Sequence, residues 1–150
     1  MSARAPEDAA NDELRYGFTD EQLVEMPLVF AEDLLKDKVF LLSGGGSGIG
    51  RATAFVLTRL GAKVMICGRR EERLIATAQS IDSHLGKRVG YHAMTIRDAE
   101  QVEQLIDATW DQFGGLDVVV NNGGGQFPQD AIDFSVKGWN AVIDTNLNGT

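Results

Sequence analysis

The stretch from Val39 to Leu57 constrains the fold of this chain more than any other part of it. Residues 39–42 are uncharged and apolar, residues 43–50 are glycine and serine with one isoleucine, and a run of small and apolar residues suited to a helix follows. A bend of this composition lets backbone N–H groups approach a ligand, and the N-terminus of the next helix adds partial positive charge. The stretch predicts a strand, a tight turn and a helix that together bind a phosphate group.

The glycine spacing distinguishes this loop from two common phosphate loops. Gly44, Gly48 and Gly50 follow the pattern G-x-x-x-G-x-G, and no frame fits G-x-G-x-x-G. The turn is not closed by Gly-Lys-Ser or Gly-Lys-Thr, so it is not a P-loop either. Nucleotide binding is the favoured interpretation, and a loop that is glycine-rich only for flexibility is the alternative.

Length and composition predict one globular unit with a real core. The 150 residues are 43% hydrophobic and 24% charged, and no apolar run approaches the roughly 20 residues of a membrane span. The 14 basic against 22 acidic residues argue against nucleic acid as a partner. The single cysteine, Cys67, has no disulfide partner and no Cys/His cluster beside it, so we expect no metal site and a reducing, cytoplasmic compartment.

Residues 1–37 are expected to form an acidic N-terminal extension, partly disordered, ahead of a nucleotide-binding unit at residues 38–150. Residues 1–11 are polar without periodicity, which is typical of a disordered tail. Residues 16–35 carry scattered apolar side chains that could pack over the domain or over a neighbouring subunit.

Strand and helix patterns alternate along the rest of the chain. Helices are predicted at 48–60, at 71–85 with Gly86 as the stop, from a cap at Asp98 to a stop at Gly114, and from a cap at Ser135 to about Asn146. Further strands are predicted at 63–67, 89–94 and 116–120. The pattern predicts an α/β fold with a Rossmann-type doubly wound parallel sheet of strand order 3-2-1-4. That order would bring the loops at 44–50 and 121–125 together at the point where ligands bind.

The end of the second strand indicates which nucleotide would bind. Residues 67–70 contain Arg69 and Arg70 and no carboxylate to accept from a ribose 2′-hydroxyl. A guanidinium matches a phosphate, so the 2′-phosphate of NADP is favoured over NAD, and Arg51 could add a second positive charge. The alternative is that these arginines are solvated, or paired with Glu71 or Glu72.

Three motifs resemble those of the short-chain dehydrogenase/reductase family. Residues 43–50 are similar to Thr-Gly-x-x-x-Gly-Ile-Gly with serine first, and residues 121–124 to Asn-Asn-Ala-Gly with glycine third. Residues 146–149 are similar to Asn-x-x-Gly, whose asparagine holds a water in the family's proton relay, so the resemblance implies a catalytic role for Asn146, with a locally bonded helix asparagine as the alternative. The residues that the resemblance and the charge pattern place at the coenzyme are Ser43, Gly44, Gly46, Ser47, Gly48, Ile49, Gly50, Arg69, Arg70, Thr95, Ile96, Asn122, Gly123 and Gly124. Thr95 and Ile96 stand where the family usually has Asp-Val against the adenine.

Residues 121–128, 137–139 and 145–147 resemble a branch that holds peroxisomal trans-2-enoyl-CoA reductase and bacterial citronellol/citronellal dehydrogenase-like oxidoreductases. This resemblance implies NADP(H)-dependent hydride transfer on a small-molecule acyl-CoA or terpenoid substrate, in the cytoplasm or, in a eukaryote, the peroxisome. A ketone or alcohol dehydrogenase of the same family, and a binding-only dinucleotide module, are the competing hypotheses.

The family's catalytic tyrosine, followed four residues later by lysine, has no counterpart here. Asp20 follows Tyr16 at that spacing, and Thr95 follows Tyr91. We therefore expect the chain to correspond to the front half of a longer enzyme, to be inactive alone, and to associate through the open edge of its fourth strand. The full-length form is expected to be a homo-oligomer.

Overall fold

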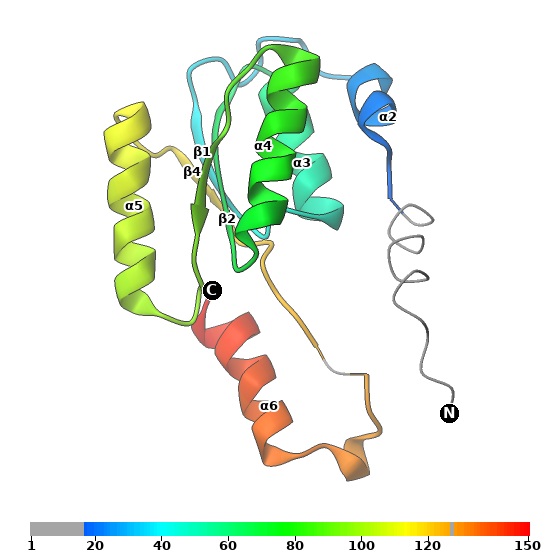
Figure 1. Ribbon diagram of the computed structural model, residues 1–150, viewed down its shortest axis with the longest axis vertical. Helices are drawn as coiled ribbons and strands as arrows, with labels where there is room; N and C mark the ends of the chain where they lie inside the picture. Colours follow the sequence, from blue (N-terminus) through cyan, green and yellow to red (C-terminus); the bar gives the residue numbers. More distant parts are fainter. Residues whose placement is uncertain (1–16, 127) are drawn as a thin grey trace.

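Four parallel strands form one sheet in the computed structural model, which describes residues 17–126 and 128–150 (Figure 1). The strands are β1 (Val39–Ser43), β2 (Lys63–Gly68), β3 (Gly90–Ala93) and β4 (Val118–Val120), in the order β3-β2-β1-β4. Leu41 in β1 lies opposite Met65 in β2 and Val119 in β4. The Rossmann-type parallel sheet predicted from the sequence, including its strand order, is confirmed.

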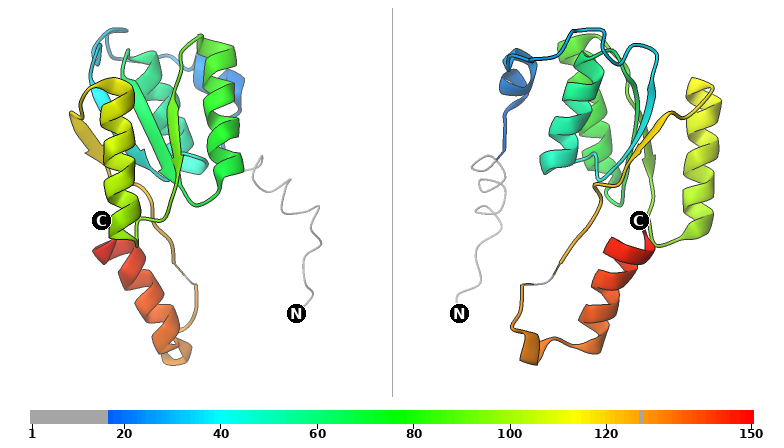
Figure 2. Two further views of the ribbon diagram at one scale, coloured as in Figure 1. Left: turned by 60° about the vertical axis from the view of Figure 1, so that its left-hand side comes forward. Right: turned by 180° about the vertical axis from the view of Figure 1, so that it is seen from behind.

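Helices cover both faces of this sheet. Helices α3 (Gly48–Arg59) and α4 (Glu71–Leu85) lie on one face, and α5 (Ala99–Phe113) lies on the other (Figures 1 and 2). The predicted caps are confirmed: Asp98 accepts from the backbone N–H groups of the first turn of α5, and Gly86 and Gly114 end α4 and α5 in the left-handed conformation.

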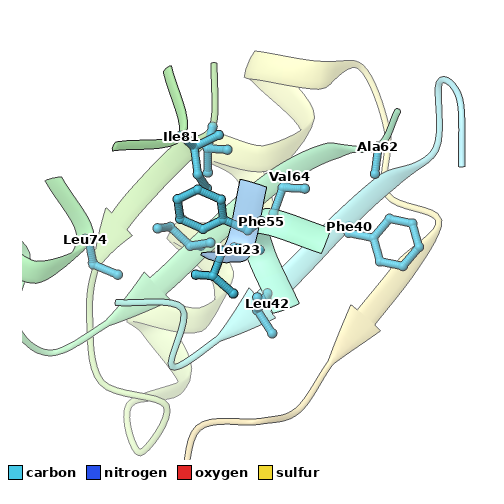
Figure 3. Close-up of a cluster of buried hydrophobic side chains, with 11 residues drawn as sticks. Leu23, Phe40, Leu42, Phe55, Ala62, Val64, Leu74 and Ile81 are labelled. Atoms are coloured by element: carbon cyan, nitrogen blue, oxygen red, sulfur yellow. The ribbon is translucent and has the colours of Figure 1, made fainter. Parts of the chain in front are cut away.

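Alternate residues of the central strands supply two hydrophobic cores. Phe40 and Leu42 of β1 join Phe55 of α3 in the cluster under α3 and α4 (Figure 3), whereas Leu41 between them packs with Leu105 of α5. Because β1 is covered on both faces, all five of its residues are buried. This double burial explains why the strand is a continuous apolar run and does not alternate with polar residues.

Part of the acidic extension is a helix that belongs to the fold. Helix α2 (Asp20–Glu25) begins at a capping box formed by Thr19 and Gln22, and its Leu23 is only 1% exposed within the core under α3 and α4. The Arg59 guanidinium of α3 donates to the carbonyl oxygens of Leu23 (2.8 Å) and Met26 (2.7 Å). The predicted packing of residues 16–35 over the same chain is therefore observed for α2, while the predicted disorder of residues 1–11 lies outside the described residues.

The last predicted helix changes its winding before it ends. Helix α6 (Val136–Ile143) starts at the predicted Ser135 cap, but residues 144–148 form a π-helical segment, η2 (Asp144–Asn148). A single-turn 3₁₀ segment, η1 (Ala131–Asp133), precedes α6. The N-terminal end of α6 projects away from the sheet, whereas the C-terminus of the chain lies near the start of α5 (Figures 1 and 2). None of the described helices has the length and apolar character needed to cross a membrane.

Candidate functional site

Side-chain hydrogen bonds join the C-terminal ends of β1 and β4, at the edge of the sheet where both glycine-rich loops begin. The Ser43 hydroxyl accepts the backbone N–H of Gly123 at 2.7 Å, and the Asn122 side-chain amide donates to the Ser43 carbonyl at 2.9 Å. Ser43 is buried beneath the loops. The predicted meeting of the 44–50 and 121–125 loops is thus observed, and it forms one continuous floor.

A cavity of about 300 Å³ lies over this floor and brings together most of the predicted site residues. The β1–α3 loop and the β4 loop form its base, the end of β2 forms one wall, and the loop after β3 forms another. The predicted residues that line the cavity are Gly44, Gly46, Ser47, Ile49, Gly50, Arg69, Arg70, Thr95, Ile96, Asn122, Gly123 and Gly124. The predicted residues outside its lining are Ser43, Gly48 and Asn146.

The floor is shaped by close backbone approach. A Cβ at Gly50 would lie 2.2 Å from the Gly44 carbonyl oxygen, so α3 can start this close to the loop only without a side chain there. Gly44 itself has φ of +74°, which glycine adopts without strain. Ser47 is the N-cap of α3, and its side chain makes no capping hydrogen bond to the described helix. The first-turn N–H groups of α3 are therefore available to an anionic ligand, which fits a pyrophosphate.

The charged side chains in the lining are all basic. They come from the end of β2, the first turn of α4 and the loop after β3, and no Asp or Glu is among the described lining residues. An acidic side chain that accepts from a ribose 2′-hydroxyl would stand at the end of β2, where this chain has Gly68. There is space for a side chain at this position, since a Cβ there would meet only Leu74, at 3.7 Å. These arginines are Arg69, Arg70, Arg73 and Arg97.

Arg51 lies outside the cavity, so the expectation that it adds a second charge there is wrong. Its guanidinium pairs with Asp20 of α2, reaches the Ser80 hydroxyl at 3.5 Å and stacks 4.9 Å from the centre of the Phe55 ring. Desolvation by burial lowers the pKa of Arg51. The physical reason for this orientation is that α2 packs against α3 and α4 and supplies Asp20, which pairs with the guanidinium while Phe55 lies against it.

The Asn146 side chain contacts the loop at residues 121–125, here called the glycine turn, and not a neighbour on its own helix. Its side-chain oxygen accepts from the Gly125 N–H at 3.0 Å, and its side-chain nitrogen donates to the Gly125 carbonyl at 2.7 Å. The alternative of a locally bonded asparagine therefore does not describe this side chain. These two bonds use one donor and one acceptor of the side-chain amide, and the catalytic role of Asn146 stays a prediction.

Several lining residues were missed by sequence reasoning. Arg73 lies in the first turn of the helix that begins just after Arg70, and Arg97 follows Ile96 directly, so their positions could have indicated both. Cys67 lines the cavity from a buried strand, and that burial raises the pKa of its thiol to about 11. The remaining missed lining residues are Gly68, Leu74, Met94 and Thr145. No group of described residues has the His, Cys, Asp or Glu cluster needed for a metal ion.

The sequence and the fold are similar to those of known proteins. Peroxisomal 2,4-dienoyl-CoA reductase [(3E)-enoyl-CoA-producing] of Danio rerio is 33% identical over 145 residues, 97% of this chain and 46% of that protein. A citronellol catabolism dehydrogenase of Pseudomonas aeruginosa PAO1 superposes with a TM-score of 0.76 at 39% identity, over 81% of this chain and 49% of the other.

The C-domain of a bacterial malonyl-CoA reductase, solved with NADP, superposes with a TM-score of 0.72 at 32% identity, over 80% of this chain and 20% of that one. The chain spans about half the length of the curated relatives it matches. The sequence model of the family described as short chain dehydrogenase matches residues 38–150. The chain therefore belongs to the short-chain dehydrogenase family of oxidoreductases.

Proposed function

We propose that this chain is the coenzyme-binding part of an oxidoreductase that uses NADP(H) on an acyl-CoA or a related acyl or terpenoid substrate. The observation that carries the choice of coenzyme is the charge of the cavity, which is lined by Arg69, Arg70, Arg73 and Arg97 and by no described carboxylate. A 2′-phosphate carries a charge that such a wall attracts, and a bare ribose hydroxyl would find no acidic acceptor at the end of β2.

The residues of the cavity divide into regions that suit the parts of this coenzyme. The 44–50 loop and the N-terminus of α3 would hold the pyrophosphate, and Arg69 and Arg70 the 2′-phosphate. Thr95 and Ile96 would flank the adenine, and the turn at Asn122–Gly124 would pass beside the ribose. When bound, NADP(H) supplies or accepts the hydride. The chain's own residues would bind and orient it.

Support for the substrate class comes from the relatives. By their names, the Danio rerio enzyme acts on a dienoyl-CoA, the Pseudomonas aeruginosa protein serves citronellol catabolism, and the malonyl-CoA reductase acts on an acyl-CoA. We favour reduction of a C=C bond conjugated to an acyl-CoA. Oxidation of an alcohol or reduction of a ketone by the same coenzyme is the second candidate, because the citronellol protein carries the name of a dehydrogenase.

A binding-only role for the isolated chain is favoured by a separate observation. Tyr91 lies on β3 and is not among the residues that line the cavity, and no other tyrosine falls within the described residues. The chain as described therefore places no phenol at the cavity to donate a proton to a substrate. We expect the 150 residues to bind coenzyme without turnover.

The experiment is a calorimetric titration of the chain with NADPH and, separately, with NADH. NADPH should bind at least about tenfold more tightly, a difference of about 1.4 kcal/mol. Similar affinities would reject the choice of NADP, and no binding of either would reject the coenzyme site itself. A longer form of the protein, assayed with NADPH on an enoyl-CoA, a ketone and an alcohol, would then decide between the two reactions.

A further inference from the structure

Arg97 connects two parts of the cavity wall that are far apart in the sequence. It sits in the loop between β3 and α5, and its guanidinium reaches across to the end of α6. Its Nε donates to the Thr145 hydroxyl at 2.7 Å, and its Nη2 donates to the Ala141 carbonyl at 2.8 Å. Both Arg97 and Thr145 line the cavity.

These contacts fall where α6 gives way to the π-helical segment. The Thr145 hydroxyl donates to the Ala141 carbonyl at 2.8 Å, so that one carbonyl accepts from two side chains. A threonine bonded to the carbonyl four residues back bends a helix, and short π segments occur mostly at functional sites. The widened turn closes through the Gly149 N–H, which donates to the Asp144 carbonyl five residues earlier at 3.0 Å.

The π-helical segment contains Asn146, the residue whose side chain hydrogen-bonds to the glycine turn. Asn146 lies within it and holds both backbone groups of Gly125. The loop that bears Arg97 also supports the far end of this segment, since a Cβ at Gly149 would lie 2.9 Å from the Ile96 side chain. The loop after β3 therefore contacts the segment before and after Asn146.

We propose that Arg97 is a positioning residue that holds the turn at 144–148 in its π-helical winding and thereby keeps Asn146 on Gly125. In this role it links the wall at Thr95 and Ile96 to the glycine turn at the base of the cavity. The functional meaning of this link rests on the proposed function, which assigns the wall at Thr95 and Ile96 to the adenine and the glycine turn to the ribose of the coenzyme. The mechanical link itself does not depend on that assignment.

A competing role for Arg97 is direct binding of a coenzyme phosphate. Its Nε already donates to Thr145 in the π-helical segment and its Nη2 to Ala141 in α6, so binding a phosphate through these two N–H bonds would require their release. The two roles differ in the absence of coenzyme, since only a positioning residue affects the Gly125 backbone then.

The test is the Arg97→Met variant of the full 150-residue chain, with Arg88→Met, at an exposed site ahead of β3, as the matched control. Hydrogen–deuterium exchange with residue-level fragmentation is measured without coenzyme. The Gly125 N–H should exchange about tenfold faster in Arg97→Met, whereas the Gly123 N–H, held by Ser43, should keep its rate. Thr145→Val, which removes one acceptor of Arg97, should shift Gly125 in the same direction by a smaller factor.

An unchanged Gly125 rate in Arg97→Met would overturn the proposal, and so would an equal acceleration of Gly123, which would indicate general loosening. Arg97→Lys, which keeps the charge but not the fork of donors, should restore the Gly125 rate only in part. NADPH affinity is measured on the same samples. Failure of every variant, including the parent chain, to bind NADPH would reject the proposed function while leaving the Gly125 result standing.

Discussion

The Ser43 hydroxyl accepts the backbone N–H of Gly123 at 2.7 Å across 80 positions of sequence, and this bond joins the two loops beneath the cavity. Ser43→Ala leaves that N–H without its acceptor in a partly shielded place. We expect the variant to lose about 1–3 kcal/mol of unfolding free energy, measured by urea denaturation. Ser83→Ala, at an exposed serine of α4, is the control and should change little. Equal losses in both variants would contradict a special role for this bond.

Arg69 is expected to discriminate between the two coenzymes. Arg69→Asp removes a guanidinium from the wall and provides a carboxylate that can accept from a ribose 2′-hydroxyl. NADPH binding should weaken by at least about tenfold, and NADH binding should weaken far less or improve. Isothermal titration with each coenzyme measures the difference. The charge-matched control is Arg88→Asp, and equal losses for both coenzymes in Arg69→Asp would remove the assignment.

Gly50 is expected to tolerate no side chain. In Gly50→Ala the new Cβ would lie 2.2 Å from the Gly44 carbonyl oxygen, so α3 or the loop must shift. We expect a loss of about 1–3 kcal/mol in unfolding free energy. The NADPH binding free energy should fall by a larger fraction of its total than the unfolding free energy does, because the floor of the cavity moves. Gly115→Ala is the control, since a Cβ there meets no atom within 4 Å. Normal coenzyme affinity in Gly50→Ala would show that the close approach is not needed.

Local sequence signals were enough to predict the sheet and its main helices. Continuous apolar runs marked β1 and β2 because both faces of these strands are covered. Gly86, Gly114 and Asp98 marked helix ends because their roles depend on neighbours within a few residues. Most of the cavity followed from this fold, since its glycine loops extend directly from the ends of β1 and β4.

The features that were missed depend on contacts between distant segments. The change of winding after Ile143 involves Arg97, which lies more than 40 positions away and whose bonds to Ala141 and Thr145 no local pattern reveals. From the sequence Arg51 is expected to act as a cation of the loop, because its partner Asp20 becomes apparent only once α2 is placed against α3. Helix α2 did have a local signal, the Thr19–Gln22 capping box, but six residues give too little periodicity to predict a helix.

Leu23 is expected to show that α2 is part of the folded unit. Its side chain is 1% exposed in the core under α3 and α4, and Leu23→Ala would leave a cavity there. The loss of unfolding free energy should be about 2–5 kcal/mol, measured by denaturant titration. Val29→Ala, at a valine that is 93% exposed, serves as the control and should have almost no effect. A small effect at Leu23 would indicate that α2 separates readily from the domain.

The start of β1 holds an ion pair whose contribution to stability should depend on pH. The Asp117 carboxylate accepts from the Lys38 ammonium at 2.9 Å and from the Val39 N–H at 2.8 Å, and these bonds lower the pKa of Asp117. The hydrogen bond to Asp117 in turn raises the pKa of Lys38. Because the pKa of Asp117 is lower in the folded state, the carboxylate contributes its full stabilisation above its ordinary pKa. It loses this contribution as the pH falls through the lowered, folded-state pKa. The ammonium contributes fully below its ordinary pKa and loses its contribution as pH rises through its own raised value.

Asp117→Asn therefore should lower the melting temperature most near neutral pH, and the difference from the parent chain should shrink as the medium becomes acidic. Melting curves of both proteins from about pH 3 to about pH 8 measure this, with Asp111→Asn, at an exposed aspartate of α5, as the control. Because both partners are largely solvated, added salt should weaken the Lys38 part of the effect and leave the hydrogen bond from Val39. A difference that stays constant into acid would mean that the carboxylate charge contributes nothing, and that Asp117 acts only as a neutral acceptor at the start of β1.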